Sequence, residues 1–433
     1  MIGRVVFLFC LQLLPVCGWS SQTPLGAEQN GSVDGAVPAW IGDSETVAST
    51  VNIITNETPN FFINSDNYLR YKAFLTPGQI ALLNKYPESF NLPIYKTYRT
   101  HIAPEWIYEA TKKNAKDVRL VENGNGITNV WPGTPFPNPR SGIEVIWNHL
   151  LHWRGVSLNF NLFEATVHSA GTHSIVQSEI FLAMPFYQKG RDAIRDNGKM
   201  IYYMNFVNQP ASLAGGGLLV HENLNSKAVP RRAWVYLADQ NRVRRLPKFE
   251  HDTALFNSEN LRVVDEVDLF SGSPSLYNWK IIEKKEVFVP YNSTKLEISV
   301  IADRNALLTR NHLAPNVTRF ERHRVWVVEG NLKKGSLHIY PKRTIYIDED
   351  SWIAVMADMY DRNGELWRTS MSHTRFRSNM KGIWKVADVH HDLKSSKYYI
   401  QSLAEPIPNS HDFYTMPPLS DFSPSSLRRA SKR

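Results

Sequence analysis

From Gly155 onward, this chain of 433 residues is a long succession of segments rich in Val, Ile, Tyr, Phe and Trp. Short turns containing Gly, Asn or Lys-Gly separate most of these segments, with longer loops around residues 215–225 and 248–260. Strands that follow one another at such short spacing predict an antiparallel meander. The 12 Trp, 18 Tyr and 20 Phe suit a broad pleated surface, and they suit an apolar pocket equally well.

Helical patterns precede this strand region. Residues 76–87 begin with a Thr-Pro pair, which predicts an N-cap followed by the first helical turn. Residues 103–117 show a second helical pattern, and residues 141–155 show a third. In the third, Ser141 and Glu144 have the spacing of a capping box, and large apolar residues fall on one face. We therefore expect an α+β fold that is mainly β, with a few helices packed on the sheet.

Composition divides the chain into four parts. Residues 1–20 have the pattern of an export signal, and residues 21–140 combine an arm, short helices and a loop. Residues 141–405 form the strand-rich body. Residues 406–433 are a Pro- and Ser-rich basic tail, whose end we expect to be disordered.

Two segments of the second part carry little regular pattern. Residues 21–60 are rich in Gly, Ser, Thr, Asn and Asp, so we expect an irregular arm with little structure of its own. Residues 132–139 contain four prolines, which exclude helix and central strand. This second segment is expected to be a stiff loop at a rim or at the hinge of a lid.

The N-terminus has the parts of a secretion signal. A short basic start, Met1 to Arg4, precedes an apolar run from Val5 to Val16, which is too short to cross a bilayer as a helix. Gly18 and Ser20 are small residues of the kind found at a cleavage site. We therefore expect a mature chain that works outside the cytoplasm and has no transmembrane segment.

Both cysteines lie inside this N-terminal segment. Cleavage removes Cys10, and Cys17 would be the candidate for a lipid anchor. Val16 stands where a lipoprotein signal has a small residue, so we do not expect an anchor at Cys17. If cleavage follows Ser20, no disulfide stabilises the mature chain, and a large core must do so.

The formal net charge of +8 is spread along the chain, with arginine clusters at Arg242 to Arg245 and Arg319 to Arg324. An exported protein without a nucleic-acid motif is not expected to bind nucleic acid. Two interpretations of the clusters remain open. They are either solvated strand faces with ion pairs, or contacts with anionic head groups or an acidic partner surface.

Two groups of histidines raise the question of a metal. His149 and His152 are three residues apart on a predicted helix and could share a face. His390 and His391 are adjacent near a predicted strand, followed by Asp392, and neighbouring strand residues point to opposite faces. A metal site needs three or four ligands at defined spacing. Neither group meets this requirement, so we expect no metal or cofactor and interpret them as histidines at packing interfaces.

Catalytic motifs are scarce. The chain has no G-x-S-x-G elbow, and the glycines at 215–217 lack the Lys-Ser/Thr of a phosphate loop, so we expect a flexible loop there. Asp348, Glu349 and Asp350 are adjacent at a predicted strand end. An acid/base pair needs two carboxylates that converge across a cleft, so three in a row favour a turn. We therefore do not expect an enzyme.

The segment from Ser351 to Met371 predicts a β-hairpin with Asn363-Gly364 as a two-residue turn. Opposite charges beside the turn and an aromatic pair further in favour one register. That register pairs Arg362 with Glu365, Asp361 with Leu366, Tyr360 with Trp367, Asp358 with Thr369 and Met356 with Met371. Apolar residues then occupy both faces, which is more than a sheet buried on one side requires.

Several of these segments resemble known families. The stretches "AWVYLADQNRVRRLP", "RTIYIDEDSW" and "MYDRNGELWR" follow in an order similar to that of the outer-membrane lipoprotein-sorting family. With "GAVPAW", "NHLLHWRG" and "VWVVEGNLKKG", the chain resembles more closely the DUF1329 family, over nearly all of residues 35–405. The likeness to lipoprotein carriers is confined to about residues 155–400.

The resemblance implies a strongly curved antiparallel sheet, an incomplete β-barrel whose concave side is plugged by helices. It further implies a periplasmic location, a hydrophobic cargo, and partners such as a resistance-nodulation-division type pump and an outer-membrane protein. No catalytic residues come with it. The candidate residues of the cavity lining are Ile143, Trp147, Leu150, Trp234, Tyr236, Trp326, Trp352, Met356, Tyr360 and Trp367.

The resulting expectation is a periplasmic, non-catalytic binding or transfer protein for lipid or another hydrophobic molecule. The helix at 141–155 is a candidate cover, although it could equally be a permanent plug of the core. An envelope sensor or assembly factor that binds a protein partner is a first alternative. A hydrolase of envelope lipids is a second, and it requires a convergent nucleophile or a metal site.

Overall fold

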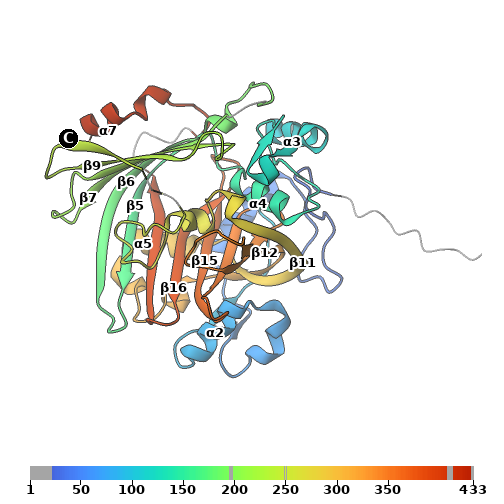
Figure 1. Ribbon diagram of the computed structural model, residues 1–433. Helices are drawn as coiled ribbons and strands as arrows, with labels where there is room; N and C mark the ends of the chain where they lie inside the picture. Colours follow the sequence, from blue (N-terminus) through green and yellow to red (C-terminus); the bar gives the residue numbers. More distant parts are fainter. Residues whose placement is uncertain (1–21, 195–197, 248, 250, 407–412, 431–433) are drawn as a thin grey trace, which may run out of the picture.

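The computed structural model (Figure 1) describes residues 22–194, 198–247, 249, 251–406 and 413–430. The expected export signal, Cys10 and Cys17 lie outside these residues. In the part that is described, no helix has the length and apolar character needed to cross a membrane. The helices are α1 (Ser44–Thr55), α2 (Pro77–Lys85), α3 (Glu105–Asp117), α4 (Gly142–Leu150), α5 (Thr294–Ala302), α6 (Arg304–Leu307) and α7 (Pro424–Ala430).

One sheet of 15 strands forms the body. Its strands are β1 (Phe61–Ile63), β2 (Leu92–Ile94), β5 (Ser157–Val167), β6 (His173–Ala183), β7 (Lys199–Gln209), β8 (Gly217–Asn223), β9 (Arg232–Leu237), β10 (Arg242–Leu246), β11 (Tyr277–Pro290), β12 (Phe320–Leu332), β13 (Lys342–Asp348), β14 (Ala354–Tyr360), β15 (Leu366–Arg377), β16 (Gly382–Asp392) and β17 (Lys397–Pro406). A separate hairpin joins β3 (Arg119–Val121) to β4 (Gly126–Thr128).

Most strands pair antiparallel with their neighbours in sequence, so the predicted meander is confirmed. The order is β1-β2-β12-β13-β14-β15-β16-β17-β5-β6-β7-β8-β9-β10, and β11 pairs with β12 beside this path. Pairing of β17 with β5 joins the end of the body to its beginning. The sheet is not strongly curled, so the expectation of a strongly curved half-barrel holds only in its coarser form, a mainly β fold with one large antiparallel sheet.

Helices cover both faces of this sheet, whereas the sequence led us to expect them on one. We call the face under α4 the inner face, where Val328, Ile345 and Ala357 contribute to the core. We call the opposite face, under α2, α5 and α7, the outer face. Strand alternation separates the two, since Val327 belongs to the outer cluster and Val328 to the inner one. The sheet is therefore the middle layer of three.

The helices begin where the sequence predicts. At α2, the Thr76 hydroxyl accepts the Gln79 N–H at 3.1 Å, and the Gln79 side chain accepts the Thr76 N–H at 3.0 Å. At α4, the Glu144 carboxylate accepts the Ser141 N–H at 3.3 Å. The start of α2 packs on the outer face, where the Asp358 carboxylate accepts the Gly78 N–H at 3.2 Å.

Three segments expected to be irregular are ordered elements. Residues 44–55 form α1, which is capped by Asp43 through a 2.8 Å bond from the Thr46 N–H. The expected flexible loop at 215–217 leads directly into β8, because the apolar residues after Gly217 pair between β7 and β9. In the tail, α7 packs on β8, β9 and β10 (Figure 1), with Leu427 buried on the outer face.

The turn of the β14–β15 hairpin is one residue longer than expected. The Asp361 N–H donates to the Glu365 carbonyl at 2.9 Å, so three residues form the loop, and Gly364 takes a left-handed φ of 78°. Tyr360 consequently faces Leu366, and the expected pairing with Trp367 is wrong.

A bulge then restores the expected register deeper in the hairpin. It leaves Trp367 unpaired between Tyr360 and Met359, so the pairs Asp358–Thr369 and Met356–Met371 are confirmed. Compensation of this kind is common where a hairpin must keep its buried faces while its turn changes length.

Substitution of Gly78 tests how closely α2 packs on the outer face of the sheet. A Cβ at this position would lie 2.0 Å from the Thr369 Oγ1 and 2.2 Å from the Asp358 Oδ1. We expect Gly78→Ala to lower the free energy of unfolding by about 3 kcal/mol, because the helix must shift. Gly364→Ala is the control, since only its positive φ opposes the change, at about 1 kcal/mol. Equal effects in denaturant titrations would contradict the close docking of α2.

Candidate functional site

An aromatic layer lies between α4 and the inner face of the sheet. Trp147 and Leu150 of α4 are buried in the same cluster as Trp352, and the rings of Trp326 and Trp352 are stacked with centroids 6.1 Å apart. Six of the ten candidate residues meet in or against this cluster, namely Ile143, Trp147, Leu150, Trp326, Trp352 and Trp367. We call this set the tryptophan layer.

The other four candidates lie elsewhere. Trp234 and Tyr236 pack on the outer face with α7. Met356 also faces outward, because a bulge makes Val355 an extra residue and interrupts the alternation of β14. Tyr360 is partly buried beneath the Lys342 ammonium, 3.9 Å from its ring centroid. The ten candidate lining residues, among them Trp352 and Met356, therefore do not share one face of the sheet.

His149 connects α4 to the two elements beside it. Its Nδ1 accepts the Ala354 N–H at 3.0 Å, which leaves Nε2–H to donate to the Phe270 carbonyl at 2.9 Å. Burial lowers the pKa of His149, so the imidazole is neutral, as these two bonds require. The neutral side chain of His149 thereby joins α4 to the β13–β14 turn and to the segment before β11.

A long loop covers the rest of the inner face. Residues 251–276, which we call the covering segment, pass over β14 and β15 through a short helical turn, η4 (Val264–Leu269). This turn carries the acidic residues Asp265, Glu266 and Asp268, all of which are buried. Buried carboxylates need partners, and here the sheet and the loop after α4 provide them.

Asp268 is held between two cations. Its carboxylate lies 3.1 Å from the Arg154 guanidinium and 3.5 Å from the Lys385 ammonium. Burial would raise the pKa of Asp268, but the charges of Lys385 and Arg154 outweigh it and hold this pKa far below its usual range. Lys385 also pairs with Asp388 at 2.7 Å.

Asp265 and Glu266 are paired on the same face. Asp265 lies 3.2 Å from the Arg343 guanidinium and 3.1 Å from His338. Although burial opposes ionisation, Arg343 lowers the pKa of Asp265 to about 2. Glu266 accepts a hydrogen bond from the Tyr340 hydroxyl at 3.2 Å. The inner face thus carries a charged band beside the tryptophan layer.

The donor atoms of His149, His152 and Asp268 lie close enough to share a metal ion. The hydrogen bonds and ion pairs described above compete with such an ion. Both nitrogens of His149 are already used in hydrogen bonds. A metal ion at Asp268 would also lie beside two permanent positive charges, Arg154 and Lys385. The cluster is therefore built as an ion-pair network, and it fits a metal poorly.

The three carboxylates at 348–350 lie at the β13–β14 turn, as expected, and all three are buried. Asp350 forms bonds of 2.6 and 2.9 Å with Arg99, which lowers the pKa of Asp350 despite its burial. Burial and the nearby Asp350 raise the pKa of Asp348 to about 6. Asp348 accepts hydrogen bonds from Ser351 and Tyr291 and holds the β13–β14 turn. These carboxylates therefore anchor the β13–β14 turn, which lies next to Trp352.

The two arginine clusters differ in exposure and in ion pairing. Residues from Arg319 to Arg324 lie in ion pairs with carboxylates that include Glu321, Glu286 and Glu349. The arginines from Arg242 to Arg245 remain exposed on the edge strand β10, and no carboxylate of the described chain lies within ion-pair distance of them. The first cluster therefore stabilises the fold, and only the second is free to meet an anionic surface.

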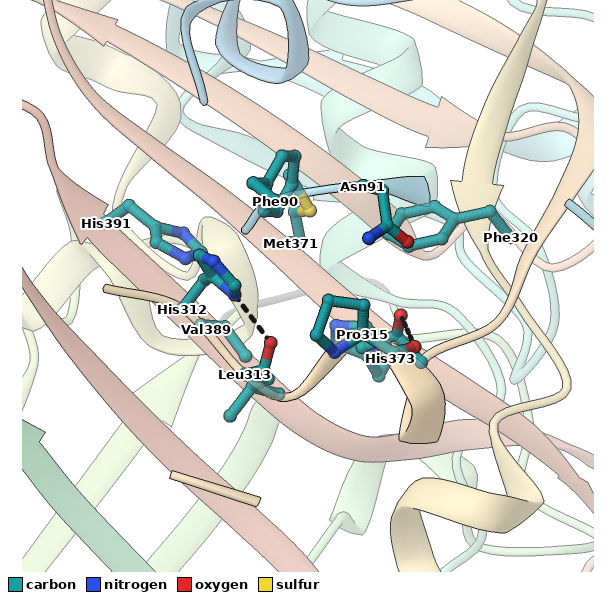
Figure 2. Close-up of a pocket in the computed structure, with 11 residues that line it drawn as sticks. Phe90, Asn91, His312, Leu313, Pro315, Phe320, Met371, His373, Val389 and His391 are labelled. Carbon is teal, nitrogen blue, oxygen red and sulfur yellow. Dashed lines mark hydrogen bonds between the residues drawn. The ribbon is translucent and has the colours of Figure 1, made fainter. Parts of the chain in front are cut away.

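A small enclosed pocket lies on the outer face of β15 and β16 (Figure 2), and its volume is about 20 Å³. His312, His373 and His391 line it together with apolar side chains. This space fits about one water molecule. A groove of about 480 Å³ between Pro24 and α3 is larger, and its lining mixes charged residues such as Glu105 and Lys112 with apolar ones. The first space is too small for an acyl chain.

Comparison with known proteins identifies the family. Residues 62–428 match the proteins of unknown function grouped as DUF1329. This chain belongs to that family. A relative, the uncharacterized protein PA3922 of Pseudomonas aeruginosa, is 38% identical over 421 residues, which cover 96% of this chain and 92% of the relative.

Two solved structures resemble this DUF1329 chain in fold. An outer membrane lipoprotein-sorting protein domain from Vibrio parahaemolyticus shares 15% identity, covers 66% of this chain and 98% of its own, and has a TM-score of 0.45. A DUF1329 family protein from Desulfovibrio piger shares 13% identity, covers 63% and 92%, and has a TM-score of 0.41. The expected DUF1329 membership is confirmed.

The sequence-based reasoning missed the charged band. Asp265 and Asp268 lie within a stretch, "VVDEVDLF", that alternates acidic and apolar residues inside a loop. That alternation was the available signal, because acidic residues set among large apolar ones are expected to be buried and to need cations. Their partners Arg154, Arg343 and Lys385 lie far away in sequence, so no local pattern reveals them.

His149 gives the first prediction for this site. We expect His149→Leu to lower the free energy of unfolding by about 2–4 kcal/mol, because it leaves the Ala354 N–H and the Phe270 carbonyl unpaired in the core. Faster amide exchange around Phe270 should accompany the loss. The exposed His173 supplies the control His173→Leu. If both variants unfold at the same denaturant concentration, His149 does not hold the three elements together.

Because of the histidines in the small pocket, we expect the folded chain to lose stability in acid. Burial lowers the pKa of His373 and of His391 to about 3, so both stay neutral in the folded chain. Below pH 6.5 the unfolded chain gains protons that the folded chain does not, and stability falls by up to about 1.4 kcal/mol per pH unit for each histidine. The double variant His373→Phe/His391→Phe should flatten this fall between pH 6.5 and 4 in unfolding titrations. An unchanged slope would disprove the assignment.

Proposed function

We propose that this protein is a non-catalytic binding and transfer protein for lipid or another hydrophobic cargo in the periplasm. It would hold the cargo between the inner face of the sheet and the elements that cover it, α4 and the covering segment. Its partners in this proposal are envelope export machinery, such as a resistance-nodulation-division type pump, and an outer-membrane protein.

The tryptophan layer is the observation that carries this proposal. Sheltering a 16-carbon chain from water is worth on the order of 12 kcal/mol, at about 0.8 kcal/mol per buried CH₂ group. The apolar surface around the stacked rings of Trp326 and Trp352 is what would supply it. Because α4 fills this space in the structure, cargo must displace the helix or the segment beside it.

The layout of α4 is compatible with such a displacement. Its contacts to the sheet are mainly apolar, and the polar contacts of its inner side are concentrated in His149. An apolar contact to the helix and an apolar contact to an acyl chain have similar energies per unit area. Cargo can therefore take the place of α4 on Trp326 and Trp352, provided that it also covers the apolar side chains that α4 itself carries.

An envelope sensor or assembly factor is the second candidate. The exposed arginines from Arg242 to Arg245 favour it, since they form a basic edge strand that suits an acidic protein partner or anionic head groups. A hydrolase receives less support, because the buried clusters at Asp268 and Asp350 are committed to ion pairs with Arg154 and Arg99.

Extraction of the purified protein tests the proposal. Protein prepared without detergent should release an amphiphile on treatment with organic solvent, detectable by mass spectrometry at a substantial fraction of the protein concentration. Trp326→Ala, which removes one side of the tryptophan layer, should carry at least tenfold less of it. Trp234→Ala on the outer face is the matched control and should retain it. Repeated absence of any amphiphile, or equal loss in the control, would count against the proposal.

A further inference from the structure

The charged band on the inner face is occupied by carboxylates of the chain itself. We propose that Asp265 and Asp268 stand in the place of the anionic head group of an amphiphilic cargo, and that the covering segment leaves when such a cargo binds. This inference rests on the proposed function and specifies the chemical class of the cargo, an apolar chain with a carboxylate or phosphate head.

Arg343 is the first cation of this site. Its guanidinium lies 3.2 Å from Asp265 and has no other carboxylate partner within the described chain. Aromatic rings surround it, with the centroids of Tyr277 and Tyr340 at 4.7 and 5.3 Å. A guanidinium held in this way by rings is pre-oriented to form two parallel hydrogen bonds with a carboxylate or a phosphate.

Arg154 is the second cation. Its one carboxylate partner among the described residues is Asp268, at 3.1 Å, and its remaining donors bind carbonyl groups at the end of α4. The neighbouring cations differ in this respect, because Lys385 also has Asp388 and Arg368 also has Asp392 on the sheet itself. Removal of the covering segment would therefore leave two guanidinium groups without a carboxylate partner, those of Arg343 and Arg154.

The two guanidinium groups lie next to the tryptophan layer. The ring centroid of Phe270 in the covering segment is 5.4 Å from the Arg343 guanidinium, and the carbonyl oxygen of Phe270 accepts the hydrogen bond from His149 of α4. Tyr340, beside Arg343, packs edge-on against Trp367 at 5.6 Å. An amphiphile could thus place its head at Arg343 and its chain along the layer.

The covering segment leaves several buried polar atoms of this site without hydrogen bonds. Neither oxygen of the Asp268 carboxylate has a hydrogen bond within the described chain, although both are buried. The same is true of Nε and Nη1 of Arg262 in the segment and of Nε of Arg343. Buried polar atoms without hydrogen bonds cost free energy. A head group that also satisfies Nε of Arg343 can therefore compete with the segment's own carboxylates.

Binding measurements on the full chain test this inference. The probes are dodecanoate, dodecanol and inorganic phosphate, followed by the change in tryptophan fluorescence or by calorimetry. We expect dodecanoate to bind at least tenfold more tightly than dodecanol, and phosphate alone to bind far more weakly than dodecanoate. Asp268→Asn, which keeps the shape of the side chain but removes its charge, should tighten the binding of both amphiphiles severalfold, because opening the covering segment then breaks a weaker contact.

Arg343→Met is the opposite variant and should remove the preference for dodecanoate over dodecanol. If neither amphiphile binds, both the proposed function and this inference fail. If both bind equally, or if Asp268→Asn weakens dodecanoate binding, the function stands and the anionic head-group site is wrong. Phosphate binding as tight as that of dodecanoate would instead reveal a site for free anions and would also overturn it.

Discussion

The buried ion pairs that tie the covering segment to the sheet are the interaction on which the rest of the structure depends. Asp265 and Asp268 carry charge into a region that also contains the tryptophan layer, and a carboxylate in such a place is stable only beside cations. Arg343, Arg154 and Lys385 provide them from three different elements. The pairs therefore fix the covering segment, and through Phe270 and His149 they fix α4 as well.

Magnitudes indicate that this closed arrangement can open. Breaking a buried ion pair by removing one partner costs about 3–5 kcal/mol, so two pairs represent about 6–10 kcal/mol. A 16-carbon chain gains on the order of 12 kcal/mol from complete burial. An anionic head would also restore the partners that Arg343 and Arg154 lose. An uncharged chain gains only from the burial of its CH₂ groups and forms no ion pair with Arg343 or Arg154. An anionic amphiphile is therefore the favoured cargo.

Local patterns were sufficient to predict much of this fold. The capping residues of α2 and α4, the meander and the deeper register of the β14–β15 hairpin all follow from short-range chemistry. The same patterns gave six of the ten candidate residues a common location in the tryptophan layer. The error at Met356 has a definite cause, since a single bulge at Val355 reverses the alternation on which the prediction relied. Pairing of Asp268 with Lys385 could not be predicted, because it joins a loop to a strand over a hundred residues away.

The most direct test of the account is the distance between the covering segment and the outer face with and without cargo. In a Cys10→Ser/Cys17→Ser background no other cysteine remains, so spin labels can be placed at Ala254→Cys in the segment and Asn84→Cys on α2, both exposed positions. Pulsed electron paramagnetic resonance should show one narrow distance distribution without ligand and a longer, broader one with dodecanoate. An unchanged distribution at saturating, independently verified binding of dodecanoate would contradict the account.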